Sequence, residues 1–217
     1  MSARGDSSER LTIAIPRGAL FGETLDLLDR LGVDTAPVRA NDRRLVFPEI
    51  GVLTVRPSDV PTYVEAGSAD LGITGKDVLL EQADRQVYEL LDLGYGGCRM
   101  IVATREGDDP LGEPLRRRGV VRIATKYPRI AATHFRDTGR QAEIVEVKGS
   151  VELAPLTGLA DAIVDLTATG RTLVENGLVE REPIVASTAR LIANPVAHKL
   201  KAGEVDRVVA RIRELHS

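Results

Sequence analysis

Short apolar runs alternate along the chain with longer segments in which apolar residues recur every three or four positions. The runs have the length of strands, and the recurring positions are typical of amphipathic helices. The first strand is expected over residues 11–15, and the turn Pro16-Arg17-Gly18 leads from it into a helix. The apolar face of that helix consists of Leu20, Leu25, Leu28 and Leu31. Alternation of this kind predicts an α/β protein built from crossover units.

The remaining elements continue the alternation to the end of the chain. Strands are expected at residues 45–47, 52–55, 70–74, 87–93, 99–104, 121–125, 143–147, 161–166 and 184–191. Helices are expected up to residue 66 and at residues 77–82, 113–118, 130–137, 151–156, 171–176 and 196–215. The last helix is amphipathic, so its apolar face is expected to pack either on its own lobe or on another subunit.

Two segments follow the same order of elements and suggest an internal repeat. Residues 63–80 (YVEAGSADLGITGKDVLL) and residues 155–174 (PLTGLADAIVDLTATGRTLV) each run helix, Gly-x-Ala-Asp, apolar strand, Thr-Gly and helix. A match this short also arises by chance. If the repeat is genuine, two similar α/β lobes would present strand ends and helix N-termini to a shared cleft. Residues 94–97 and 187–195 would then be hinges.

Composition and charge exclude several function classes. The chain has 29 Lys and Arg against 32 Asp and Glu, and aromatic residues make up only 3% with no Trp. This balance argues against nucleic-acid binding, which usually needs a basic surface and stacking aromatics. The first ten residues lack the apolar region of a secretory signal, and no apolar run approaches the roughly 18 residues of a membrane span. We therefore expect a soluble cytoplasmic protein without a membrane partner.

Cysteine and histidine give no sign of a metal or nucleophile site. Cys98 is the only cysteine, so no internal disulfide can form, and we expect it to pack as a small apolar residue. The three histidines, His134, His198 and His216, are far apart and form no ligand-spaced pair. The sequence therefore offers no basis for a zinc site or a catalytic triad.

The strongest candidate for a ligand site is the segment from Asp161 to Leu173, DAIVDLTATGRTL. A strand delivers the chain to a turn of hydroxylated residues and glycine directly before a helix, whose first N–H groups lack partners within the helix. Thr167, Thr169 and Thr172 can donate hydroxyl hydrogen bonds, and Gly170 allows close backbone approach. A phosphate monoester suits these groups.

Asp165 lies beside this turn and would repel an anion. A carboxylate can, however, accept hydrogen bonds from the vicinal hydroxyls of a ribose while the turn holds a phosphate. The alternative is an ordinary strand-to-helix turn in which Thr169 caps the helix. From these residues alone, a sugar-phosphate site and a purely structural turn both remain open.

Five blocks of sequence, spread over nearly the whole chain, carry a more specific signal. They are IAIPRG at 13–18, SADLGITGKDVLLE at 68–81, ATKYP at 124–128, KGSVELAP at 148–155 and GLADAIVDLTATGRTLVENGL at 158–178. With these blocks the chain resembles the ATP phosphoribosyltransferases, which catalyse the first step of histidine biosynthesis. The resemblance implies a reaction in which N1 of ATP displaces diphosphate from phosphoribosyl diphosphate with Mg²⁺, giving phosphoribosyl-ATP.

The resemblance also implies the fold and its division. The fold would be α/β and two-lobed, periplasmic-binding-protein-like (type II), with a central cleft. Lobe I would comprise residues 1–98 plus 188–217, and lobe II, residues 99–187, would carry the phosphoribosyl diphosphate loop. The implied phosphoribosyl diphosphate-binding residues are Glu152, Asp165, Thr167, Ala168, Thr169, Gly170, Arg171 and Thr172. Among them the loop would hold the 5-phosphate and Asp165 the ribose hydroxyls, whereas Glu152 is the weaker candidate, for ribose or metal contact.

Arg17 and Arg56, each placed after a strand of lobe I, are the implied catalytic residues. Arg17 would face the diphosphate leaving group at a position where the family often has Lys, and Arg keeps the charge but changes the geometry. Arg56 would serve the ATP triphosphate or the departing diphosphate, or else form a surface salt bridge. Asp70, Gly72 and Thr74 would lie near ATP. The reaction needs no protein nucleophile, so catalysis would consist of positioning and electrostatics.

Because Ser217 follows soon after the last predicted helix, we expect no C-terminal regulatory domain of the kind that the long form of the family carries. The resemblance is therefore to the short form, a catalytic subunit that works with a histidyl-tRNA synthetase-like regulatory subunit, usually in a hetero-octamer. A homodimer of catalytic chains is expected as well. Two alternatives stay open: a non-catalytic module of the same fold that binds a small anion or another solute, and an unrelated nucleotide-sugar enzyme with the same phosphate loop.

Overall fold

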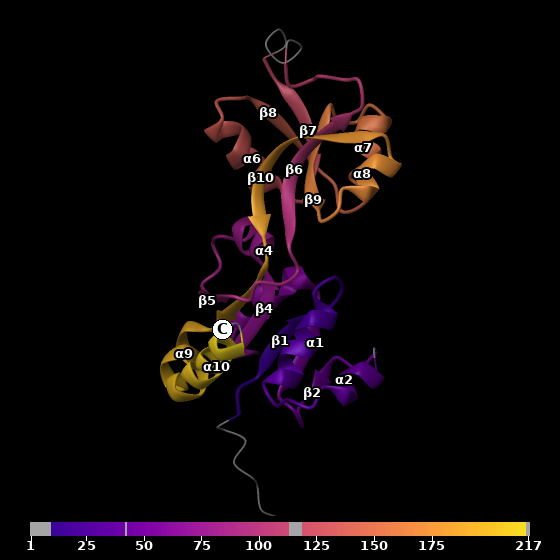
Figure 1. Ribbon diagram of the computed structural model, residues 1–217. Coiled ribbons are helices and arrows are strands. Elements are labelled where there is room, and N and C mark those ends of the chain that lie inside the picture. Colours follow the sequence, from indigo (N-terminus) through magenta and orange to yellow (C-terminus); the bar gives the residue numbers. More distant parts are fainter. Residues whose placement is uncertain (1–9, 42, 113–118, 216–217) are drawn as a thin grey trace, which may run out of the picture. The chain divides into compact units, whose positions relative to one another are not determined.

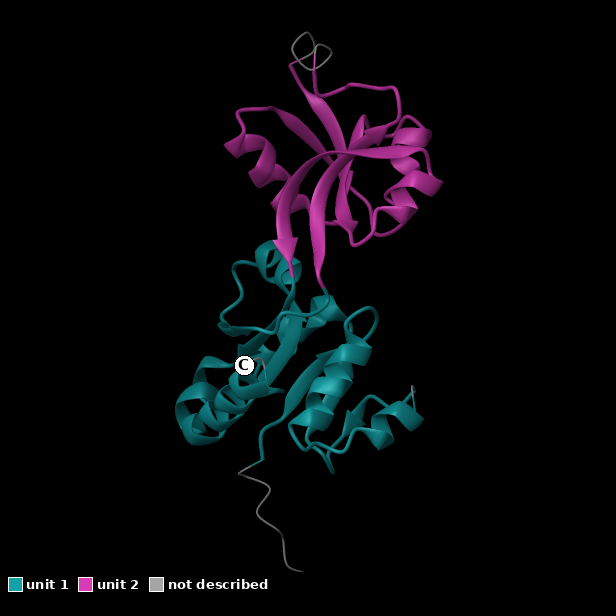
Figure 2. Cartoon of the chain, viewed as in Figure 1, with its two compact units in different colours: residues 1–96, 188–217 teal, residues 97–187 magenta. Residues whose placement is uncertain are grey.

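The computed structural model describes residues 10–41, 43–112 and 119–215. The chain forms two compact units, coloured separately in Figure 2. Unit 1 comprises residues 1–96 and 188–217, and unit 2 comprises residues 97–187. Each unit has its own sheet and its own apolar core.

Unit 1 is built on a six-stranded sheet in the order β2-β3-β1-β4-β11-β5 (Figure 1). Its strands are β1 (Ile13–Pro16), β2 (Val46–Phe47), β3 (Val52–Val55), β4 (Leu71–Gly75), β5 (Tyr88–Asp92) and β11 (Ala189–Ala193). Its helices are α1 (Phe21–Arg30), α2 (Ala36–Ala40), the 3₁₀ turn η1 (Pro57–Asp59), α3 (Val60–Glu65), α4 (Lys76–Glu81), α9 (Pro195–Leu200) and α10 (Ala202–Leu215). Strands β3, β1 and β4 are parallel, which the alternating pattern of strands and helices predicts.

Helices cover both faces of the unit 1 sheet, so β1 is buried along its whole length. On one face Ile13 and Ile15 pack with residues of α1 and with Ile212 of α10. On the other face Ala14 packs with Val60 and Val64 of α3. The apolar run at residues 11–15 was thus a sound indicator of a strand buried on both faces.

Unit 2 is built on a five-stranded sheet in the order β10-β6-β9-β7-β8. Its strands are β6 (Cys98–Arg105), β7 (Val121–Thr125), β8 (Ala142–Glu146), β9 (Ala162–Thr167) and β10 (Leu178–Ser187), and its helices are α6 (Pro128–Asp137), α7 (Leu153–Leu156) and α8 (Arg171–Glu175). β7 is parallel to β8 and β9, whereas β6 is antiparallel to β9 and β10. Ile101, Ile163 and Leu173 are buried together and form the centre of one apolar cluster.

Two of the predicted elements near the C-terminus are wrong. The single strand expected at 184–191 is two strands, β10 and β11, which belong to different sheets. β10 also begins earlier than predicted, because this edge strand exposes charged residues such as Glu180 and lacks an apolar run. The single helix expected at 196–215 is interrupted at Lys201, which separates α9 from α10. The helix expected at 113–118 lies outside the described residues.

The internal repeat is confirmed by the strand pairing. α3-β4-α4 in unit 1 and α7-β9-α8 in unit 2 follow the same order. Both β4 and β9 have a parallel strand on one side and an antiparallel strand on the other. The Asp of each Gly-x-Ala-Asp block also makes the same pair of contacts, described next.

Asp70 and Asp161 each form hydrogen bonds that link two parallel strands at their amino ends. The backbone N–H of Asp70 donates to the carbonyl of Thr12 at 2.8 Å, and its Oδ2 accepts the Thr12 N–H at 2.8 Å. Asp161 makes the same two bonds with Arg122, at 2.9 and 2.8 Å. Satisfying a strand-end N–H with a carboxylate is a structural task, and it explains why both repeats carry Asp at this position.

Gly72 should be essential for the packing of α3 on β4. A Cβ at Gly72 would lie 2.6 Å from Val64 Cγ2 and 2.7 Å from Val60 Cγ1, closer than carbon atoms pack. We expect Gly72→Ala to lower the free energy of unfolding by about 1–3 kcal/mol, as overpacked cores do. Urea denaturation measures this loss. Gly22→Ala is the matched control, because a Cβ there meets nothing within 4 Å in α1 and should instead be neutral or stabilising. Equal stabilities for the two variants would contradict the packing argument.

Candidate functional site

The predicted phosphate loop lies in unit 2 between β9 and α8 (Figure 1). Gly170 has a φ of 76°, in the left-handed region that glycine adopts without strain. Its N–H donates to Thr167 Oγ1 at 2.9 Å, so a side chain closes the turn. The hydroxyl hydrogen of Thr167 is still available, since its oxygen acts here as the acceptor.

Several backbone donors of the loop have no acceptor in the described part of the chain. They are the N–H groups of Ala168, Thr169 and Thr172. The Arg171 N–H makes only a long contact of 3.4 Å with Thr169 Oγ1. Because α8 has only five residues, its dipole is small, and attraction for an anion depends mainly on these N–H groups and the threonine hydroxyls. Donors of this kind suit a phosphate group.

The side chain of Arg171 has a local partner. Its Nε donates to Glu175 Oε1 at 2.8 Å, one turn further along α8, and the side chain is 83% exposed. An exposed ion pair of this kind contributes little to stability and is easily broken. A role of Arg171 in binding phosphoribosyl diphosphate stays a prediction.

Asp165 is buried near the end of β9, and Lys126 lies beside it. Asp165 is 8% exposed, and its Oδ1 accepts the Leu166 N–H at 2.9 Å. Lys126 Nζ lies 3.9 Å from Asp165 Oδ2. Lys126 directly follows β7, whose Thr125 pairs with Val164 of β9, so parallel pairing places the two charges next to each other.

Lys126 is a further candidate site residue, to which the sequence does not point. ATKYP at 124–128 contributed only to the family resemblance, and no role was predicted for its lysine. The available signal was a basic residue directly after a strand. What the sequence could not supply was the neighbour of that strand, because β7 pairs with β9 across a long stretch of intervening chain.

Burial raises the pKa of Asp165, and the ammonium of Lys126 and the Leu166 N–H only partly oppose this rise. The carboxylate of Glu152, which lies just before α7, raises the pKa further. The folded protein therefore holds the Asp165 proton more tightly than the unfolded chain does. The ionised carboxylate costs stability as the pH rises through the folded-state pKa, and a ligand that donates hydrogen bonds to it would recover that cost.

The donor set of this site fits Mg²⁺ that binds together with a diphosphate. Among the described residues, no group of three or more His, Cys, Asp and Glu side chains could hold a metal ion alone. Mg²⁺ is, however, usually bound through one or two carboxylates plus substrate phosphates. Asp165 and Glu152 are close enough to interact and supply two carboxylates near the loop.

Arg17 and Arg56 lie together at the carboxyl edge of the unit 1 sheet. Pro16 pairs with Val55 in the parallel β1-β3 ladder, and each arginine is the next residue. Arg17 Nε donates to Thr54 Oγ1 at 3.0 Å and its Nη2 to the carbonyl of Arg44 at 2.9 Å, which holds the guanidinium in place. Arg56 is exposed and forms no ion pair with the carboxylates that the structure describes. The pair is a local concentration of positive charge.

The three residues predicted to lie near ATP are spread along β4 rather than gathered at this edge. Thr74 is at the carboxyl end but buried, and its hydroxyl donates to the carbonyl of Pro57 at 3.0 Å. Gly72 lies inside the strand under α3. Asp70 is at the amino end, where Lys201 Nζ also contacts it at 2.8 Å. Their ATP contacts stay predictions, and Asp70 and Gly72 have structural roles of their own.

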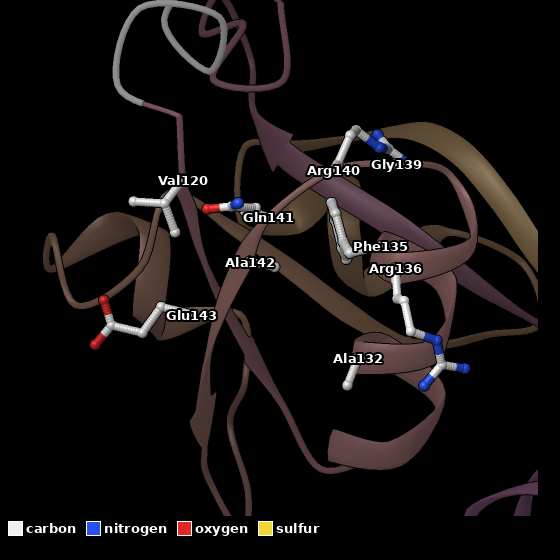
Figure 3. A pocket seen from close by; sticks show the side chains of 9 residues that line it. All are labelled: Val120, Ala132, Phe135, Arg136, Gly139, Arg140, Gln141, Ala142 and Glu143. Carbon is white, nitrogen blue, oxygen red and sulfur yellow. The ribbon is translucent and has the colours of Figure 1, made fainter.

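A pocket elsewhere on unit 2 contains none of the predicted site residues (Figure 3). It lies between α6 and β8. Arg140 on its wall is placed over the ring of Phe135 at 4.6 Å, and its Nη1 pairs with Glu182 at 2.7 Å. Arg136, the other arginine that lines the pocket, pairs with Asp137 at 3.2 Å. Both positive charges are thus already compensated, so the pocket offers little attraction for an anion.

No helix in the described ranges is long and apolar enough to cross a membrane.

The fold itself has solved relatives of very different sequence. The chain is similar to the periplasmic aliphatic sulphonate binding protein SsuA of Escherichia coli, with a TM-score of 0.61 at 14% identity over 94% of this chain and 71% of that one. It is also similar to an arginine-bound ArgBP of T. maritima, with a TM-score of 0.56 at 13% identity over 96% and 97% of the two chains. The protein is therefore of the α/β, two-lobed, periplasmic-binding-protein-like (type II) class, which confirms the predicted fold class.

Relatives with higher sequence identity identify the family within this fold class. A family model described as HisG, ATP phosphoribosyltransferase, matches residues 56–214. The ATP phosphoribosyltransferase of Geobacillus sp. (strain WCH70) is 50% identical over 94% of this chain and 98% of its own length, and that of Rubrobacter xylanophilus is 49% identical over 93% and 94%. A chain of the ATP phosphoribosyl transferase (HisG:HisZ) complex from Thermotoga maritima is 35% identical, with a TM-score of 0.79 over 94% of this chain and 98% of that one. The chain belongs to the ATP phosphoribosyltransferase family.

Lys126 should keep the Asp165 carboxyl more acidic than burial alone would allow. Lys126→Met removes a positive charge 3.9 Å from Asp165, so we expect the pKa of Asp165 to rise further. Titration of the Asp165 carboxyl by NMR measures the shift. Lys126→Arg should restore most of the effect, and Lys148→Met, which removes an exposed lysine paired with Glu146, should cause none. An unchanged pKa in Lys126→Met would refute the pairing.

Proposed function

We propose that this protein is an ATP phosphoribosyltransferase that joins ATP to phosphoribosyl diphosphate in the first step of histidine biosynthesis, in the cytoplasm. The observation that carries the proposal is the loop of unit 2, where free N–H donors and threonine hydroxyls follow a strand that carries a buried carboxylate. This arrangement occurs in a chain that belongs to the family over nearly its whole length.

The loop and Asp165 divide the recognition of phosphoribosyl diphosphate between them. The N–H groups of Ala168, Thr169 and Thr172, with the threonine hydroxyls, would donate to the 5-phosphate. Asp165 would accept hydrogen bonds from the ribose hydroxyls, which replace the water that burial has removed from its carboxylate. Glu152 would assist at the ribose or at a metal ion.

Glu152, together with substrate oxygens, would hold Mg²⁺, which supplies charge neutralisation on the diphosphate when it is bound. In the reaction N1 of ATP bonds to C1 of the ribose, the bond from C1 to the diphosphate oxygen breaks, and its electron pair leaves with diphosphate. Arg17 and Arg56 are proposed to stabilise the negative charge on that leaving group. No protein nucleophile is required, because the acceptor nitrogen belongs to ATP.

The expected regulatory partner is supported by one relative. The Thermotoga maritima structure is of a HisG:HisZ complex, and the HisG-like chain in it covers 94% of this chain. We propose that this protein likewise acts as the catalytic subunit of a hetero-oligomer with a histidyl-tRNA synthetase-like partner. A hetero-octamer that contains homodimers of the catalytic chain is the expected arrangement.

Formation of phosphoribosyl-ATP tests the proposed activity directly. With ATP, phosphoribosyl diphosphate and Mg²⁺, the product is followed by its ultraviolet absorbance, with and without the regulatory partner. If no product forms under either condition, the proposed enzymatic activity is rejected. Calorimetric binding of phosphoribosyl diphosphate without turnover would instead favour a solute-binding module of the same fold.

Asp165→Ala should weaken phosphoribosyl diphosphate binding more than ATP binding. The substitution removes the acceptor for the ribose hydroxyls, and the loss of hydrogen bonds to a charged group corresponds to about 1.5–3 kcal/mol, roughly a factor of 10 to 100 in Kd. Isothermal titration calorimetry with each substrate measures the two losses separately. Equal losses for both substrates would contradict the assignment.

The same carboxyl should make phosphoribosyl diphosphate binding depend on pH. Only ionised Asp165 accepts hydrogen bonds with both oxygens, and its raised pKa means that protonation begins at a higher pH than for an exposed aspartate. We expect affinity to fall as the pH is lowered through that pKa. In Asp165→Asn this acid limb should be absent from the calorimetric profile, and an unchanged limb would assign the titration to another group.

A further inference from the structure

Arg99 joins the phosphate loop to the far edge of the unit 2 sheet. It is the second residue of β6, directly opposite Thr167 in the β6-β9 ladder. Its Nη1 donates to the carbonyl of Ala168 at 3.2 Å. Its Nε and Nη2 donate to the carboxylate of Glu180 on β10, with the shortest contact at 2.6 Å. One guanidinium therefore bridges β10 and the loop across β6.

The contact with Ala168 determines where a loop donor points. A trans peptide group is planar, with its C=O and the N–H of the next residue on opposite sides. Because Arg99 holds the Ala168 carbonyl, the Thr169 N–H is directed away from Arg99. That N–H is one of the loop donors that have no acceptor in the part of the chain that the structure describes. Arg99 thus fixes the direction of an N–H group that can donate a hydrogen bond to a phosphate.

Stability alone does not explain the Arg99–Glu180 pair. The two side chains are 40% and 29% exposed, and exposed ion pairs contribute little to the free energy of folding. Bidentate contact does, however, restrict the orientation of a guanidinium, which a lysine could not reproduce. The geometry favours a role in orientation, in which Glu180 holds the arginine and the arginine holds the loop.

We propose that Arg99, held by Glu180, is a positioning residue that orients the loop at Ala168 and Thr169 for the 5-phosphate of phosphoribosyl diphosphate. The proposal rests on the proposed function and extends it to two residues outside the loop. Arg99 acts through the backbone of the loop and does not itself contact the substrate.

Arg99→Met should separate the two substrates in steady-state kinetics. We expect KM for phosphoribosyl diphosphate to rise roughly tenfold, the effect of losing one hydrogen bond from a charged donor, whereas KM for ATP stays the same and kcat changes less. Arg99→Lys should restore only part of the loss, because one ammonium does not reproduce the fork. Arg136→Met is the matched control in the same unit, since that arginine is exposed and pairs with its neighbour Asp137.

Glu180→Gln tests whether Arg99 acts as proposed. If Glu180 positions Arg99, KM for phosphoribosyl diphosphate should rise in Glu180→Gln, but less than in Arg99→Met. In the double variant this KM should be no higher than in Arg99→Met alone. If Arg99 bound the phosphate directly, Glu180→Gln would leave that KM unchanged or lower it, and this result would overturn the proposal.

The activity of the wild-type protein distinguishes a wrong positioning role for Arg99 from a wrong proposed function. A wild-type protein that forms no phosphoribosyl-ATP rejects the function, whereas an active wild type with an unchanged KM in Arg99→Met rejects only the positioning role. Circular dichroism of each variant checks folding. If Arg99→Met does not fold, the result with Glu180→Gln alone decides, because that substitution keeps the size of the side chain.

Discussion

The pairing of β9 with β7 on one side and β6 on the other is the constraint on which the candidate site depends. The parallel register of Thr125 with Val164 brings Lys126 beside Asp165. The antiparallel register of Arg99 with Thr167 brings a guanidinium to the loop carbonyl. Because side chains alternate across a strand, a shift of one residue in either ladder would turn these groups to the opposite face. The loop is thus a short turn whose chemistry is set by its two neighbouring strands.

The burial of Asp165 shows how a sheet prepares a charged group for a ligand. Burial removes water from the carboxylate, and Lys126 and one backbone N–H compensate for only part of that loss. A neighbouring carboxylate, Glu152, adds repulsion. Such a site is costly when empty, and hydroxyl donors or a metal ion would relieve it. The electrostatics around Asp165 therefore favour a ligand that brings hydrogen-bond donors or a cation to this carboxylate.

The internal repeat accounts for the scaffold but not for the chemistry. Asp70 and Asp161 fasten equivalent strand pairs in the two units, through the same two backbone bonds. The units differ at the other end of the central strand. In unit 1, β4 ends at Gly75 and α4 begins at Lys76, whereas in unit 2 three residues separate β9 from α8. Those three residues belong to the predicted phosphate loop, which has N–H donors without acceptors among the described residues. Unit 1 has no loop residues at the matching position.

Most of the secondary structure of this protein could be predicted from its sequence. Apolar runs predicted the buried strands β1, β4, β7 and β9 because both faces of each are covered. Small hydroxylated residues before a helix predicted the turn that ends at Gly170, and the binding of an anion there stays a prediction. The pattern failed where exposure removed it, as in the first half of β10.

Only the tertiary structure determines which side chains contact the loop. Arg99 lies 69 positions from the carbonyl that it holds, and nothing local in the sequence indicates that contact. Composition and periodicity report which side chains leave water and which local turns they favour. Strand order and register decide which of the buried and charged groups then meet, and these depend on how the whole sheet packs.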